Sequence, residues 1–242
     1  MIIIVLMIDA LGYNYLSKDS FWYKYSQMIT NDIPTITCPN WITILTGKKC
    51  TEHKILNNED IGRNNFIFPH TTIFSDYPNY TKYFISDWHP LRKTVQHDVT
   101  FVHTRKVWTA LHKLLKYSIA PNTLIILNTD RLDTVAHINH WGSKQYYNTL
   151  QKIDNHTHAI NCKLAKLNKK YVLFGIADHG GHKDDHEDHT NPLIRQVPLL
   201  TISNVPVGKF SINTNDQFRR HIKKIVNKNT KIIKKKIIKH KT

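Results

Sequence analysis

The stretch YVLFGIADHGGHKDDHEDH, residues 171–189, joins an apolar run to a segment dense in histidine and carboxylate. Its first seven residues are aliphatic, aromatic or small, which predicts a buried strand that delivers Asp178 and His179 to its C-terminal end. Gly180 and Gly181 then allow the backbone to turn tightly beneath these side chains. The last thirteen residues hold four histidines and five carboxylates. A solvated acidic loop needs neither so many histidines nor a buried strand before them, so the stretch predicts a metal site.

The rest of the chain alternates apolar runs with segments of helical spacing. Expected strands cover residues 2–8, 67–74, 83–86, 123–127 and 197–202, in addition to 171–177. Expected helices cover residues 11–27, 39–47, 105–118, 143–167 and 216–226, and a polar loop covers 48–65. Strands that are apolar throughout and separated by helices predict an α/β fold, with a mostly parallel central sheet covered by helices on both faces.

Several chemically capable side chains fall near the C-terminal ends of these strands, the edge where open α/β sheets bind ligands. Asp133 and His137 stand four residues apart, so in a helical turn they share one face, although an isolated pair of this kind is more often a surface pair or a cap. The candidate ligands are Asp9, Asp133, His137, Asp178, His179 and one of His182, His186 and His189. This set suffices for two ions, and nitrogen and oxygen ligands without thiolate suit zinc or manganese.

The positive charge of the chain is concentrated near its end. The formal net charge is +16, yet residues 219–241 contain 11 Lys and Arg and no acid. We therefore divide the 242 residues into one domain, residues 1–230, and a basic tail, residues 231–242. The tail is either an arm for polyanions or the continuation of a last helix with solvated lysines.

Features of secreted or membrane proteins are few. The apolar start lacks a basic leader region and is interrupted by Asp9, so we expect neither a signal peptide nor a membrane span. Cys38, Cys50 and Cys162 are too scattered for a disulfide framework, which favours a reducing, cytoplasmic location.

The order of the motifs resembles a known family. After Asp9 come PTITCPN (34–40), EHKILNN (52–58), LDTVAH (132–137) and ADHGGH (177–182). This series is similar to the type I phosphodiesterase/nucleotide pyrophosphatase family of the alkaline phosphatase superfamily. The resemblance implies an alkaline-phosphatase-like core, here with few insertions, and metal-dependent hydrolysis of a small phosphodiester or nucleotide pyrophosphate.

The resemblance also implies roles for individual residues. Thr37 would be the nucleophile, at a helix N-terminus that favours phosphate, and Asn58 would help to bind a phosphate oxygen. One ion would take Asp9, Thr37, Asp178 and His179; the other would take Asp133, His137 and a final histidine. A D-H-G-G-H-G-x-G-H-G variant of the last motif indicates His186, but several of its glycines are replaced here, which leaves His182 and His189 as alternatives. Cys38 occupies a position that is usually aromatic, which argues against base stacking there.

Three other functions deserve comparison. A phosphomonoesterase or phosphomutase of the same superfamily would use much the same ligands, but it needs an added cation, and the sequence near Thr37 has no arginine. A sulfatase is disfavoured because CPN lacks the C-x-P-x-R motif. A basic nucleic-acid-binding protein with a non-catalytic metal site would explain the tail but not the ordered series of motifs.

Overall fold

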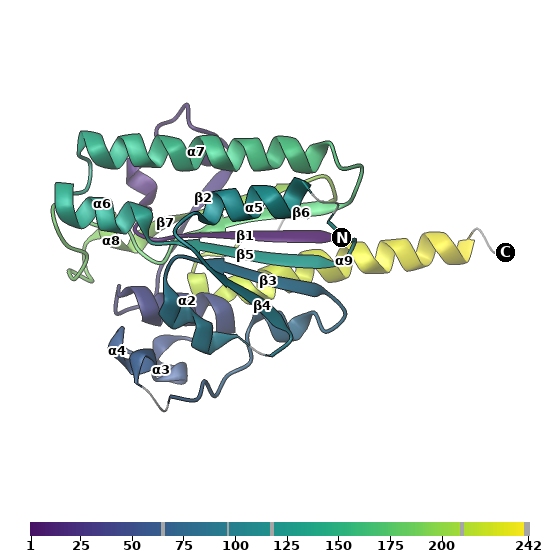
Figure 1. The fold of residues 1–242 in the computed structure, drawn as a ribbon, viewed down its shortest axis with the longest axis horizontal. Coiled ribbons are helices and arrows are strands. Elements are labelled where there is room, and N and C mark those ends of the chain that lie inside the picture. Colours follow the sequence, from purple (N-terminus) through teal and green to yellow (C-terminus); the bar gives the residue numbers. More distant parts are fainter. Residues whose placement is uncertain (64–65, 96, 117–118, 209–210, 240–242) are drawn as a thin grey trace.

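A seven-stranded sheet forms the centre of the computed structural model (Figure 1). The structure describes residues 1–242 except 64–65, 96, 117–118, 209–210 and 240–242, and of residues 230–239 it describes the backbone alone. The strands are β1 (Ile2–Ile8), β2 (Ser26–Thr30), β3 (Thr81–Ser86), β4 (Val99–His103), β5 (Thr123–Thr129), β6 (Tyr171–Ile176) and β7 (Gln196–Ser203). Their order is β2-β7-β6-β1-β5-β3-β4, and only β7 runs antiparallel to its neighbours. The predicted α/β fold with a mostly parallel sheet is confirmed.

Helices cover both faces of this sheet, which is why its central strands are apolar throughout. In Figure 1, α1, α5, α6 and α7 lie on one side and α2 and α9 on the other. The longer helices are α2 (Thr37–Thr46), α5 (Val107–Lys116), α6 (Arg131–Asn139), α7 (Lys144–Ala165) and α9 (Phe218–Lys239). The short helices are α1 (Phe21–Tyr25), α3 (Cys50–His53), α4 (Glu59–Gly62) and α8 (Pro192–Arg195), with 3-10 turns at Tyr13–Tyr15, Ile73–Asp76, His89–Thr94 and Asn215–Gln217.

The three central strands end together at one edge of the sheet. Ile8 of β1 pairs with Thr129 of β5, and Met7 pairs with Ile176 of β6. Every residue of these three strands is buried. The polar residues that follow them therefore converge at the left end of the sheet in Figure 1.

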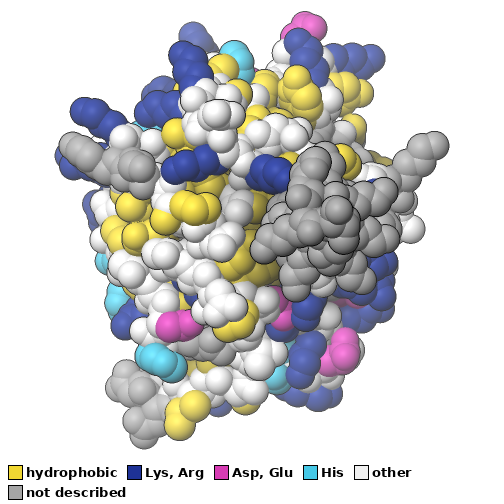
Figure 2. All heavy atoms as spheres, turned by 90° about the vertical axis from the view of Figure 1, so that its right-hand side faces the viewer, with side chains coloured by type: hydrophobic (Ala, Val, Ile, Leu, Met, Phe, Trp, Pro, Cys, Tyr) yellow, Lys and Arg dark blue, Asp and Glu magenta, His cyan; other side chains and the backbone are white. Residues whose placement is uncertain are grey.

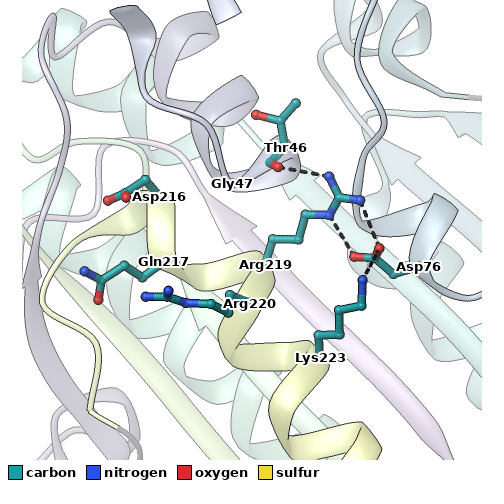
Figure 3. Close-up of a pocket in the computed structure, with 8 residues that line it drawn as sticks. All are labelled: Thr46, Gly47, Asp76, Asp216, Gln217, Arg219, Arg220 and Lys223. Carbon is teal, nitrogen blue, oxygen red and sulfur yellow. Dashed lines mark hydrogen bonds and ion pairs between the residues drawn. The ribbon is translucent and has the colours of Figure 1, made fainter. Parts of the chain in front are cut away.

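Helix α9 is fastened to the body by a group of three charged residues that we call the α9 latch: Asp76, Arg219 and Lys223 (Figure 3). Arg219 donates to both carboxylate oxygens of Asp76, from Nε at 2.7 Å and from Nη2 at 2.9 Å. Its Nη1 donates to the carbonyl oxygen of Thr46 at 3.0 Å. Gly47, the left-handed C-cap of α2, lets α9 approach, since a Cβ there would meet Arg219 Cβ at 3.3 Å. The latch thus ties α9 to the C-terminal end of α2.

Several predicted elements differ from the structure. Residues 67–74 form no strand but a coil that enters the turn Ile73–Asp76, and Ile67 is 86% exposed. The helix predicted for 11–27 is only the short α1, and the strands β2 and β4 were missed because each is half-exposed at an edge of the sheet. The predicted tail begins as helix, because α9 continues to Lys239; residues 240–242 lie outside the described part.

The end of the molecule at which the central strands begin is rich in Lys and Arg side chains, with few acids among them (Figure 2). Among the helices that the structure describes, none combines the length and apolarity needed to cross a membrane.

Candidate metal centre and nucleophile

Three carboxylates meet at the C-terminal edge of the central strands. Asp9 follows β1, Asp178 lies two residues past β6, and Asp133 is in the first turn of α6, which follows β5. Asp9 is 2% exposed and Asp178 is fully buried. The turn after Asp9 passes through Ala10 at a φ of 63°, a left-handed conformation that side chains rarely adopt outside functional sites.

His179 lies at the centre of the cluster. Its Nε2 lies 3.4 Å from Asp9 Oδ1, 3.5 Å from Asp178 Oδ2 and 3.3 Å from Thr37 Oγ1. Its Nδ1 contacts the carbonyl oxygen of Gly180 at 2.8 Å. A carbonyl oxygen only accepts, so Nδ1 carries the hydrogen. Burial, reinforced by neighbouring His186, lowers the pKa of His179 to about 3, so Nε2 presents a lone pair to the carboxylates.

Two more histidines repeat this arrangement. His186 Nδ1 contacts the carbonyl oxygen of Thr35 at 2.8 Å, and His137 Nδ1 contacts that of Asp184 at 3.1 Å. Each ring is therefore oriented by a backbone carbonyl, which leaves its Nε2 free for the cluster. His137 Nε2 lies 3.4 Å from Asp133 Oδ1. Histidines that ligate metals are typically oriented by such a bond from their other nitrogen.

The carboxylates themselves are short of partners. Asp9 Oδ1, Asp133 Oδ1 and Asp178 Oδ2 are buried and accept no hydrogen bond. Burial, followed by the charge of Asp178, raises the pKa of Asp9 well above its ordinary value. Burial and then the charge of Asp133 do the same to Asp178. Buried charges of one sign need a compensating cation or protons.

These residues fit divalent cations. Ligand atoms of Asp9, Asp178 and His179 lie within 4.8 Å of one another, as do those of Asp133, His179 and His186. Unpaired carboxylate oxygens and imidazole lone pairs are the donors that zinc and manganese take in proteins. A cation at Asp133 would take the place of the contact between its Oδ1 and His137 Nε2, which is an ion pair only when His137 is protonated.

The structure places His186 in the cluster and its two alternatives outside it. The ring of His186 stacks on that of His179, with centroids 3.9 Å apart. His189 is engaged elsewhere, because its Nδ1 contacts the Thr35 hydroxyl at 2.7 Å. His182 is exposed and belongs to neither group of potential metal ligands among the described residues; His137 is also exposed and outside both groups, but it contacts Asp133.

Thr37 begins α2 and faces the cluster. The preceding loop is fixed by buried amides: Asn40 Nδ2 donates to the carbonyl oxygen of Pro34 at 2.8 Å, and Asn215 Nδ2 donates to Asn40 Oδ1 at 2.7 Å. Asn40 and Asn215 are fully buried. This network holds the first turn of α2, and hence the Thr37 hydroxyl, against His179.

Asn58 lies next to this helix start. Its Oδ1 accepts from the Cys38 backbone N–H at 2.8 Å, so it caps the first turn of α2 from a separate loop. The Cys38 side chain is fully buried, and burial raises its thiol pKa. Cys38 therefore offers neither a stacking surface nor a thiolate.

Sequence reasoning missed three residues that shape the cluster. Thr35 holds both His186 and His189, and Asn31 Nδ2 donates to the carbonyl oxygen of Asp178. Trp141 lies against Gly181, where a Cβ would come within 2.0 Å of the indole, and its centroid is 5.1 Å from that of His137. Apart from the one between Trp141 and His137, these contacts join distant segments, so no spacing in the sequence indicates them.

The comparisons with known proteins agree with this geometry. Residues 3–72 match the family model for type I phosphodiesterase/nucleotide pyrophosphatase. No curated protein matches the chain in sequence. An inactive form of murine ectonucleotide pyrophosphatase/phosphodiesterase 5, solved with AMP, is 18% identical with a TM-score of 0.59; the match covers 74% of this chain but only 56% of that one.

Two bacterial structures overlap more of the chain. The phosphoglycerol transferase GacH of Streptococcus pyogenes, solved with sn-glycerol-1-phosphate, is 14% identical with a TM-score of 0.64, over 89% of this chain and 72% of that one. An alkaline phosphatase superfamily protein from Vibrio parahaemolyticus is 13% identical with a TM-score of 0.58, over 93% and 65%. The chain therefore shares the fold of these structures, and over residues 3–72 it matches the type I phosphodiesterase/nucleotide pyrophosphatase family that its motifs resemble.

Proposed function

We propose that this protein hydrolyses a phosphodiester or nucleotide pyrophosphate bond with Thr37 as nucleophile and two divalent ions, zinc or manganese. The ligands of one ion would be Asp9, Thr37, Asp178 and His179, and those of the other Asp133, His137 and His186. Two such ions supply positive charge beside the attacking and leaving oxygens of a displacement at phosphorus.

The residues of the chain perform the remaining steps. Thr37 Oγ attacks phosphorus, the bond to the leaving oxygen breaks and that oxygen takes up the proton lost by Thr37, and the phosphoryl group, which keeps its second ester, is held on Thr37. Water then attacks phosphorus, the bond to Oγ breaks, and Thr37 regains its proton. The N-terminus of α2 favours the negative oxygens through its N–H groups and dipole, and the Asn58 amide lies beside it to bind one of them.

A single observation carries this proposal. The Thr37 hydroxyl lies 3.3 Å from His179 Nε2, which itself faces two buried carboxylates without a positive partner. An ordinary structural hydroxyl or histidine would not be buried among unpaired acceptors, because each unsatisfied buried polar group costs about 1–3 kcal/mol. A site that binds cations and then uses them accounts for this arrangement.

The test compares bis-p-nitrophenyl phosphate with p-nitrophenyl phosphate, with added zinc or manganese and with a chelator. We expect diester hydrolysis that needs metal, falls roughly 10³-fold or more in Thr37→Ala, and partly survives in Thr37→Ser, which keeps a hydroxyl. Elemental analysis should find up to two ions per chain in wild type, with ions still bound in Thr37→Ala. Full activity of Thr37→Ala, or activity without metal, would refute the mechanism, and preference for the monoester would indicate a phosphatase.

Transfer to an alcohol is the second candidate. The phosphoglycerol transferase structure overlaps more of this chain than the pyrophosphatase structure does. The same phosphothreonine would form, and an alcohol instead of water would attack it. Glycerol added to the diester assay separates the two, because a transferase forms a glycerol phosphodiester whereas a hydrolase releases the free monoester.

A further inference from the structure

The start of α6 is held by a side chain from another strand. Asp87 directly follows β3, and its Oδ1 accepts from the Asp130 N–H at 2.9 Å. Its Oδ2 accepts from the Thr129 hydroxyl at 2.6 Å. Asp130 is the N-cap residue of α6, yet its own side chain makes no capping bond. Asp87 therefore fixes the backbone at the residue where α6 begins.

Thr129 extends the hydrogen bonding of Asp87 to the first residue of α6. Thr129 Oγ1 accepts from the Arg131 N–H at 3.3 Å while its hydroxyl donates to Asp87. A carboxylate beside the first N–H groups of a helix also interacts favourably with its dipole. The backbone carbonyl of Asp87 contacts His103 Nε2 at 3.2 Å, at the end of β4. The ends of β3, β4 and β5 are thus joined through one residue.

Helix α6 packs against α7, but among its nine residues only Leu132 and Ala136 are buried. Apolar packing thus involves one stripe of the helix, and the contacts at its ends add to its placement. Asp133 and His137 lie on this helix, and metal ligands must be placed within a fraction of an ångström.

On the basis of the proposed function, we infer that Asp87 is a positioning residue that holds Asp133 and His137 in place to bind an ion. Asp87 itself is no ligand, because both its oxygens are engaged by Thr129 and Asp130. Partners behind metal ligands typically contribute 10–100-fold in metal affinity. The inference extends the metal centre to a strand that supplies no ligand.

The experiment measures zinc binding to metal-free protein against a chromophoric chelator, with the thermal midpoint of each metal-free variant recorded beside it. Asp87→Ala should weaken binding at one site by roughly 10–100-fold. Asp87→Asn should weaken it less, because its amide oxygen can still accept from Asp130. The matched control is Asp98→Asn, which removes the partner of Lys82 beside the start of β4 and should leave zinc affinity unchanged. In an Asp133→Ala background, which lacks that site, Asp87→Ala should have no further effect.

Wild-type affinity in Asp87→Ala would overturn the inference while leaving the proposed function intact. The inference would also fail if Asp98→Asn lowered the thermal midpoint as much as Asp87→Ala does and lost as much zinc affinity. The effect on zinc would then come from general destabilisation. A wild-type protein that binds no zinc or manganese would instead refute the proposed function itself, and the inference with it.

Discussion

Asp76 and Asp178 are both withdrawn from solvent, with side chains 7% and 0% exposed, but their surroundings are opposite. Asp76 lies in the α9 latch, where Arg219 donates two hydrogen bonds and Lys223 one to its carboxylate, and its pKa lies below the ordinary value. Asp178 lies beside Asp9 and Asp133, with one oxygen unpartnered and its pKa raised. Where a carboxylate serves stability, the chain provides Arg and Lys as its cations; where Asp9, Asp133 and Asp178 converge, it provides only imidazoles.

Asp178→Asn should have the largest effect, a loss of turnover together with a gain in stability. The amide oxygen can still accept from the Ala10 and His179 N–H groups, while the charge that repels Asp133 is lost. We expect turnover to fall roughly 10³-fold. Relief of about 1 kcal/mol of repulsion should raise the thermal midpoint of the metal-free protein by about 2–4 °C. Calorimetry with excess chelator, beside the diester assay, tests both; a lower midpoint would mean that this carboxylate stabilises the fold.

Asp76→Asn should instead lower the stability of the protein and leave its turnover unchanged. It leaves Arg219, 17% exposed, without its charged partner, which should cost about 3 kcal/mol and lower the thermal midpoint by roughly 6–12 °C. Turnover per folded molecule should stay at the wild-type level. Chemical denaturation and the diester assay at 20 °C check the two parts, and a specific loss of turnover would show that the latch acts on Thr37 through α2.

The ion pairs of Asp76 with Arg219 and Lys223 predict that the free energy of unfolding depends on pH. Burial acts to raise the pKa of Asp76, but hydrogen bonds from Arg219 and then Lys223 outweigh it, so the folded-state pKa lies below 3.8, the ordinary value. The stabilisation is therefore complete above roughly pH 5 and is lost as the pH falls through the lower, folded-state value. The difference in unfolding free energy between wild type and Asp76→Asn, measured from pH 3 to 6, should shrink only at the acid end. A constant difference would indicate that charge is irrelevant to the latch.

Lys223→Ala should have the smallest effect. The Lys223 side chain is 52% exposed, so its contact with Asp76 is screened by solvent and should contribute less than about 1 kcal/mol. The difference from wild type should vanish in 1 M salt. Lys228→Ala, also on the exposed part of α9, is the control. A loss as large as that of Asp76→Asn would mean that Lys223, and not Arg219, holds the latch.

The sequence predicted those parts of the fold that are buried on both sides. Strands β1, β5 and β6 are uninterrupted apolar runs because helices cover both faces, and the aspartates after them mark their ends. Strands β2 and β4 carry a mixed pattern because one side of each meets solvent. Conversely, the apolar letters of residues 67–74 include the exposed Ile67, so composition alone misled the prediction there.

The residues of the candidate site also divide into those that the sequence predicted and those that it could not. Asp9, Asp133, Asp178 and His179 follow predicted strands and converge where those strands end, whereas His137 belongs to neither group of potential ligands among the described residues. The final histidine could not be chosen from spacing, because its place depends on Thr35, 151 residues away, whose carbonyl orients His186. Asp87 was missed for the same reason, since its partners Thr129 and Asp130 are 42 and 43 residues distant. Contacts of this kind become visible only in three dimensions.

The central position of β1 has a consequence for the order of folding. Ile2 pairs with Thr123 on one side and with Tyr171 on the other, so the strand that starts the chain must await partners from its second half. Pairing across such long separations is slow, because the entropy of closing the loop is lost before the contacts form. Asp9 meets His179 only when β1 and β6 are aligned. A folding intermediate in which β6 is not yet paired with β1 would therefore lack the candidate metal centre.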